Sequence, residues 1–159
     1  MSAMMPDKLT LWSWLFPLTY VIHIAEEFYG GEGYLAYLKK IRGVDMSPTK
    51  FLVGQAIGLA LIIAGILIAR WRDFPRQMLV ILGTIVLING VSHLLTSSYY
   101  GEYGPGLVSG VLIWIPFGIV TLIRFKNDMK PVRYWLYVGV GVAINAAIAV
   151  MTLNGGKSG

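Results

Sequence analysis

Apolar residues in this chain gather into five long runs that short polar segments separate, at residues 9–25, 51–69, 78–95, 107–123 and 134–153. A helix needs about 20 residues to cross the roughly 30 Å hydrocarbon core of a bilayer. Each run approaches that length. The pattern therefore predicts an all-α, polytopic membrane bundle of five transmembrane helices. We expect a single membrane domain over residues 1–154 and a flexible tail over residues 155–159.

The first run is the least apolar of the five, because Thr10, Ser13, Thr19 and Tyr20 interrupt it and Pro17 lies within it. A signal peptide is the competing interpretation. No small-residue cleavage pattern follows the run, which ends in charged residues instead. We therefore interpret it as a membrane span.

The connection after the first run is the longest in the chain, at about twenty residues. Residues 34–42 in its middle, "YLAYLKKIR", mix aromatic and aliphatic side chains with three basic ones. Such a composition is typical of an amphipathic helix lying in the membrane interface. A short interfacial helix is therefore expected after the first span.

The composition agrees with a bilayer as the main solvent. Hydrophobic residues make up 56% of the chain and charged residues 13%, and the mean hydropathy is +0.66. A soluble domain carries about 25% charged residues. The formal net charge is +5, but the lysines and arginines form short clusters between apolar runs. We therefore expect membrane lipids as partners and no nucleic acid.

The distribution of positive charge predicts an orientation. With five alternating spans, eight lysines and arginines fall on the amino-terminal side and five on the opposite side. The positive-inside rule places the richer side in the cytoplasm. We expect an integral protein of an inner or plasma membrane of the bacterial type, with a cytoplasmic N-terminus. The chain has no cysteine, which excludes disulfides, thiolate catalysis and iron–sulfur clusters.

Small residues recur at four-residue spacing in two runs, as Gly54 and Gly58 and as Gly139, Ala143 and Ala147. Such faces let helix backbones approach closely in membranes. Packing inside the bundle is the simpler explanation. A homo-oligomer interface is the alternative, and the sequence leaves it open.

Polar residues cluster at the ends of two runs. The stretch "VIHIAEEFYGG" places His23, Glu26 and Glu27 at the end of the first run, and Asn89 and His93 lie near the end of the third. Alternating spans bring these ends to the same side of the membrane. A charge at the centre of a span costs about 2.5–3.5 kcal/mol, and less near an interface. We therefore expect these polar groups to face one another.

The residue types suit a metal site. On a helix, His23 lies three residues before Glu26 and four before Glu27, so both carboxylates can flank the imidazole. Imidazole with carboxylate suits a divalent metal such as Zn, Fe or Mn. We assign His23, Glu27 and His93 as metal ligands and name Glu26, Glu27 and Asn89 as catalytic candidates. The sequence does not decide which glutamate is the ligand and which the base.

These residues favour a metal-dependent hydrolase that acts on a lipidic or prenylated substrate near one membrane surface. Asn89 would then stabilise an oxyanion. The alternative is a non-enzymatic membrane module, such as a proton or ion relay, a carrier or a subunit. A purely structural polar cluster is the third interpretation.

Three motifs also carry a family resemblance. The residues His23-Ile-Ala-Glu26-Glu27 spell H-x-x-E-E, and "NGVSH" and "YGPGL" follow later in the chain. With these motifs, the chain resembles the HXXEE-domain family of small multi-helix membrane proteins, over roughly residues 11–123. The resemblance implies that His23, Glu26 and Glu27 are the defining positions and that Asn89 and His93 accompany them. It implies no activity.

Overall fold

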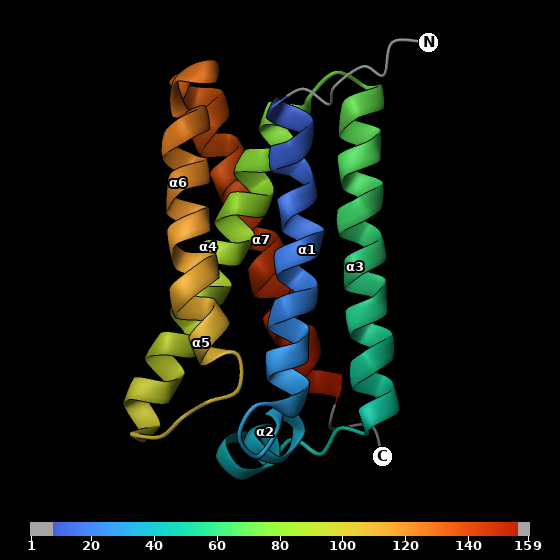
Figure 1. The fold of residues 1–159 in the computed structure, drawn as a ribbon, viewed down its shortest axis with the longest axis vertical. Coiled ribbons are helices and arrows are strands. Elements are labelled where there is room, and N and C mark those ends of the chain that lie inside the picture. The colour runs from blue at the N-terminus through green and yellow to red at the C-terminus, as the bar shows by residue number, and fades with distance from the viewer. Residues whose placement is uncertain (1–7, 156–159) are drawn as a thin grey trace.

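A computed structural model describes residues 8–155 of the chain, and every regular element in that part is helical. Figure 1 shows long helices running side by side along the bundle. The helices, in chain order, are α1 (Lys8–Tyr29), α2 (Tyr34–Arg42), α3 (Pro48–Trp71), α4 (Pro75–Tyr100), α5 (Leu107–Ser109), the π-helix η1 (Gly110–Trp114), α6 (Ile115–Phe125), the 3-10 helix η2 (Lys126–Asp128) and α7 (Pro131–Gly155). The predicted all-α architecture is confirmed.

The helix boundaries follow local chemistry. Proline begins α3, α4 and α7, where its fixed φ suits the first turn and its missing N–H loses no bond. The Ser47 hydroxyl accepts a hydrogen bond from the Lys50 backbone N–H and so caps α3. Gly43 and Gly101 end α2 and α4 in the left-handed conformation.

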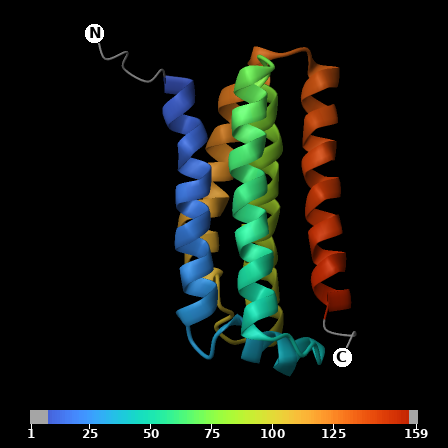
Figure 2. The ribbon, with the colours of Figure 1, turned by 90° about the vertical axis from the view of Figure 1, so that its right-hand side faces the viewer.

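The predicted number of spans is wrong for the described residues. Four helices are long and apolar enough to cross a membrane, namely α3, α4, the stretch Leu107–Asp128 and α7. α1 runs beside α3 along the bundle but is not among these four (Figures 1 and 2). The reason is its share of polar residues. Ser13, His23 and Glu27 are buried in α1, so this helix brings polar groups into the bundle.

The predicted short helix has the expected bounds. α2 covers Tyr34–Arg42 and lies across the ends of the long helices (Figure 2). The α2 residues Tyr37 and Leu38 are buried against the bundle, whereas the basic residues of its last turn are exposed. Its position in a membrane interface stays a prediction.

α4 is the central helix, because it packs against α1, α3, η1, α6 and α7. Leu79 and Val80 of α4 are fully buried, next to Phe16 and Ile66 in the apolar core. α4 and α6 approach closely at two glycines. A Cβ on Gly118 would lie 2.8 Å from the Gly83 carbonyl oxygen, so only a small residue allows this packing.

The two small-residue stripes have different surroundings. Gly58 packs against the Tyr20 hydroxyl, so on α3 the glycine serves packing inside the bundle. On α7, Gly139, Ala143 and Ala147 are all exposed. A homo-oligomer interface there stays a prediction. The expected flexible tail, residues 155–159, lies outside the described residues except for Gly155.

Candidate metal centre

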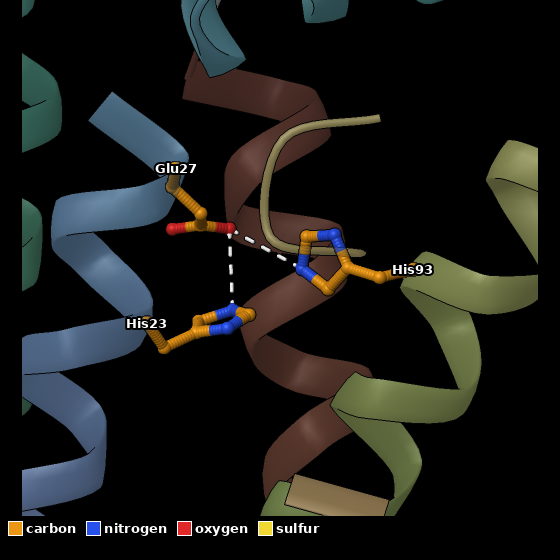
Figure 3. Close-up of side chains that lie close together, drawn as sticks. All are labelled: His23, Glu27 and His93. Carbon is orange, nitrogen blue, oxygen red and sulfur yellow. Dashed lines mark ion pairs between the residues drawn. The ribbon is translucent and has the colours of Figure 1, made fainter. Parts of the chain in front are cut away.

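Two histidines and one glutamate converge at the end of the bundle that α2 covers. His23 and Glu27 come from the last two turns of α1, and His93 comes from the C-terminal third of α4 (Figure 3). The Glu27 Oε1 atom lies 3.6 Å from His23 Nε2 and 3.3 Å from His93 Nε2. One ligand atom from each residue lies within 4.8 Å of the other two. The predicted juxtaposition of these three side chains is therefore present.

The cluster is shielded from the surroundings. His23 is 1% exposed and Glu27 is 6% exposed. The imidazole of His23 stacks on the indole of Trp114, with ring centroids 3.6 Å apart. Trp114 ends the π-helix η1, and such widened turns occur often at functional sites. The π-helix thus places the Trp114 ring against His23.

Ser109 fixes the orientation of His23. The Nδ1 atom of the ring lies 2.7 Å from the Ser109 Oγ atom. The Nε2 atom is buried and has no hydrogen-bond partner among the described residues. Metal-ligating histidines commonly bind a protein group through one ring nitrogen and the metal through the other. Ser109 leaves Nε2 free for that second role.

The two distances from Glu27 Oε1 to the histidines are longer than direct hydrogen bonds. Donors about 2.1 Å from a tetrahedral zinc lie roughly 3.4 Å from one another. The measured 3.3 Å and 3.6 Å agree with that spacing. An N–H···O hydrogen bond would place its heavy atoms about 2.9 Å apart. His23, Glu27 and His93 could therefore hold a metal ion between them.

The other oxygen of Glu27 is also held. Gln55 on α3 donates from Nε2 to Glu27 Oε2 across 3.3 Å. Tyr20 in turn donates its hydroxyl hydrogen to Gln55 Oε1 at 2.5 Å. This chain of contacts orients the carboxylate so that Oε1 faces the histidines.

Glu26 has a different environment from its neighbour. Its Oε1 atom accepts hydrogen bonds from the Val108 backbone N–H and the Tyr103 hydroxyl, both at 2.8 Å. Its Oε2 atom accepts one from the Ser109 backbone N–H at 2.6 Å. Free backbone N–H groups at the start of a helix attract anions. Glu26 therefore ties the beginning of α5 to α1, and with it the serine that orients His23.

A glycine lies directly against both histidines. Gly106 has φ +88°, and a Cβ at this position would lie 2.6 Å from His93 Cε1 and 2.9 Å from His23 Cε1. Both the backbone angle and the contact require glycine. The sequence shows a Pro-Gly turn before the fourth run, but nothing in it reveals this contact.

Asn89 lies one turn from His93 on α4 but bonds to none of the three cluster residues. Its Oδ1 atom is buried without a hydrogen-bond partner in the described part of the chain. Asn89 and His93 both line a cavity of about 420 Å³. The proposed oxyanion role of Asn89 stays a prediction.

Tyr34 is a site residue that sequence reasoning missed. Its ring centroid lies 6.4 Å from that of His93. It lines the 420 Å³ cavity and also a second cavity of about 200 Å³ that contains Glu27. Burial, and secondarily the Glu27 carboxylate, raise the pKa of Tyr34 above its ordinary value. The phenol therefore stays neutral beside the two cavities that it lines.

The comparisons with known proteins give a family and no activity. A model of the family described as "Protein of unknown function with HXXEE motif" matches residues 14–121, and the chain belongs to this family. The matched range contains all three residues of the cluster. No curated protein and no solved structure matches the chain.

Proposed function

We propose that this protein is a metal-dependent hydrolase of the membrane, with a divalent ion of Zn, Fe or Mn held by His23, Glu27 and His93. The observation that carries the proposal is the spacing of the three ligand atoms around an otherwise unpaired, buried His23 Nε2 atom. Burying a polar nitrogen without a partner costs about 1–3 kcal/mol. A bound ion offsets that cost.

The membrane location rests on α3, α4, α7 and the stretch Leu107–Asp128, each long and apolar enough to span. Many large apolar side chains on these helices are exposed, among them Leu61, Leu112 and Met151. Exposed apolar surface of this extent suits lipid better than water. The cluster lies on the last turns of α1 and the C-terminal third of α4, at the α2 end of the bundle, where a substrate in the adjoining leaflet could reach it.

The chain's own residues have distinct roles in this proposal. A bound divalent ion would polarise a substrate carbonyl and lower the pKa of a coordinated water. His23 and His93 would hold such an ion through their ring nitrogens, and Glu27 would supply an anionic oxygen ligand. The Asn89 amide can stabilise negative charge that develops on a carbonyl oxygen.

Glu26 is better suited to positioning than to proton transfer. Three donors already occupy its two oxygens. We therefore propose Glu27 as the metal-ligating carboxylate and Glu26 as the residue that holds α5, and through it Ser109, in place. This proposal chooses between the two glutamates, which the sequence leaves open.

Hydrolysis of fatty-acyl esters and amides by protein in lipid nanodiscs tests the proposal. Glu27→Gln keeps the size of the side chain but removes the ligand charge, and we expect a loss of activity of at least 100-fold. Glu102→Gln is the matched control, because Glu102 pairs with Lys40 and lines neither cavity. Activity should also vanish with a chelator and return with added metal. Equal activity in Glu27→Gln and wild type would contradict the proposal.

A relay is the second candidate function, because the contacts from Tyr20 through Gln55 to Glu27 and the histidines form a continuous polar chain. Such chains occur in membrane proteins that move protons. Metal-free protein that carries protons across proteoliposomes and loses this property in Gln55→Leu would favour the relay over the hydrolase.

A further inference from the structure

The two ends of the bundle carry very different charge. At one end α1 begins, α3 passes into α4 and α6 passes into α7, and we call it the basic end (Figures 1 and 2). Eight exposed cations lie there, namely Lys8, Arg70, Arg72, Arg76, Arg124, Lys126, Lys130 and Arg133. Asp73 and Asp128 are the acidic residues of this end in the described chain, so its net charge is +6.

Most of these cations have no acidic partner. Arg76 forms an ion pair with Asp128, whose Oδ2 atom lies 3.0 Å from Arg76 Nε. Arg124 lies over an aromatic ring instead, with its Cζ atom 5.3 Å from the centroid of Trp12. Apart from Arg76, no cation of the basic end pairs with an acid in the described part of the chain. Their positive charge is therefore available to an external anion.

The α2 end has the opposite balance. It carries four cations, Lys39, Lys40, Arg42 and Lys50, and five acids, Glu26, Glu27, Glu32, Asp45 and Glu102, so its net charge among the described residues is −1. Lys39 pairs with Asp45 at 2.7 Å, and Lys40 pairs with Glu102 at 2.5 Å. A count of lysines and arginines alone does not show this difference, because it leaves out the acids beside them.

Exposed tryptophans indicate that the basic end lies at a membrane surface. Trp71, the last residue of α3, and Trp135 on α7 are both strongly exposed. Trp is enriched at the boundary between hydrocarbon and water. Arg72 follows Trp71 directly, and its Cζ atom lies 4.5 Å from the centroid of the Trp71 ring. The cations of the basic end therefore lie at the depth of lipid headgroups.

The proposed metal centre lies far from this surface. Arg76 and His93 are 17 residues apart on α4, which is about 25 Å along the axis. The hydrocarbon core of a bilayer is roughly 30 Å thick. Beyond the centre, the strongly exposed Tyr29 on α1 and Tyr99 on α4 suit the second boundary of the membrane. The centre therefore belongs to the leaflet opposite the basic end.

We propose that the basic end binds anionic phospholipids of the cytoplasmic leaflet and thereby holds the centre of His23, Glu27 and His93 in the opposite leaflet. Lipid phosphates supply the negative charge that the cations of the basic end lack, and this attraction acts within about 10 Å of the membrane surface. The α2 end, with its net negative charge, gains nothing from such a contact. A substrate of the centre would then come from the non-cytoplasmic side. The inference goes beyond the proposed function and depends on neither metal nor hydrolysis.

Labelling of single thiols tests the orientation, because the chain has no cysteine of its own. Asn127→Cys places a thiol in the exposed 3-10 helix η2 of the basic end, and Asp45→Cys places one in the exposed segment after α2. Each variant is expressed in a bacterium, and its spheroplasts are treated with a membrane-impermeant maleimide before or after lysis. We expect about tenfold more labelling of Asp45→Cys than of Asn127→Cys before lysis, and equal labelling afterwards. The reverse pattern, or equal labelling before lysis, would overturn the proposal.

Electron paramagnetic resonance with spin-labelled lipids tests the lipid contact itself, on protein reconstituted into phosphatidylcholine. Spin-labelled phosphatidylglycerol should associate about fivefold more tightly than spin-labelled phosphatidylcholine with the wild type. Arg72→Gln, Lys126→Gln and Lys130→Gln together should abolish this preference. None of these three residues forms an ion pair with a described acid, so their replacement breaks no such contact within the bundle.

The matched control removes the same charge from the α2 end. It combines Lys39→Gln, Lys40→Gln and Arg42→Gln and should keep the preference for phosphatidylglycerol. Circular dichroism checks that both triple variants stay helical, and the thiol labelling needs neither of them. Equal association of the two lipids with the wild type would overturn the proposal. A preference that the basic-end variant keeps, or that both triple variants lose alike, would overturn it as well.

Discussion

The Ser109 hydroxyl lies 2.7 Å from the Nδ1 atom of His23, although 86 positions separate the two residues in the chain. Ser109 is itself held by Glu26, which accepts its backbone N–H. The H-x-x-E-E motif thus does two tasks from one helix. His23 and Glu27 face the centre, while Glu26 fixes the segment that orients His23.

Ser109→Ala should weaken metal binding without removing a ligand. The loss of a residue that orients a metal-bound histidine typically costs 10–100-fold in affinity. We expect the same range here, measured by competition with a chelator of known affinity. Ser92→Ala is the control, because the Ser92 hydroxyl bonds only to the Ile88 carbonyl oxygen of its own helix. Equal affinity in Ser109→Ala and wild type would remove Ser109 from the site.

Gly106→Ala should disrupt the centre even though Gly106 offers no ligand. The new Cβ would come within 2.6 Å of His93 and 2.9 Å of His23, so the two rings must separate. Gly101→Ala is a close control, since Gly101 also has a positive φ, of +67°, but nothing lies within 4 Å of its Cβ position. Both variants carry backbone strain of about 1 kcal/mol. Only Gly106→Ala should lose metal, and comparable losses in the two would show that strain alone is responsible.

Tyr103→Phe should lower stability modestly at neutral pH. It removes the hydroxyl that donates to Glu26 and keeps the ring that packs against Gly31. We expect a loss of about 1 kcal/mol, measured by thermal unfolding in detergent. Tyr99→Phe, at a strongly exposed position, is the control and should have no effect.

The hydrogen bond between Tyr103 and Glu26 should stabilise the folded protein less at high pH. Burial, together with the bond to Glu26, raises the pKa of Tyr103 to about 12. Because the pKa of Tyr103 is higher in the folded state, its neutral hydroxyl contributes its full stability below the ordinary tyrosine pKa of about 10. This contribution to stability is lost as the pH rises through the pKa of the folded state. The difference between wild type and Tyr103→Phe should therefore be constant from pH 7 to 9 and shrink towards pH 12. A difference that grows with pH would contradict this assignment.

Much of the centre is predictable because it depends on regular helices. Alternating apolar runs place the ends of the first and third runs on one side, so the pattern predicts His23 and His93 at a similar depth. The i,i+4 spacing also places Glu27 beside His23. Neither inference needs the detailed packing of the bundle.

The remaining contacts depend on segments whose path the sequence does not specify. Gly106 and Ser109 reach the histidines only because the segment after α4 folds back over the end of α1. Tyr34 reaches His93 only because α2 turns across the bundle. Counting apolar runs overestimates the number of spans. α1 is long enough to cross a membrane, but it carries polar side chains that are buried inside the bundle. A run count does not distinguish a helix that spans lipid from one that carries a site.

The most direct test is elemental analysis of protein purified in detergent after growth with zinc, iron and manganese. We predict about one divalent ion per chain in wild type, and loss of that ion in His23→Ala, His93→Ala and Glu27→Gln, with the helical content unchanged in each. Glu102→Gln, outside both cavity linings, should keep its metal. Wild-type protein that is fully folded yet metal-free under these conditions, and that takes up no metal on titration, would contradict the account.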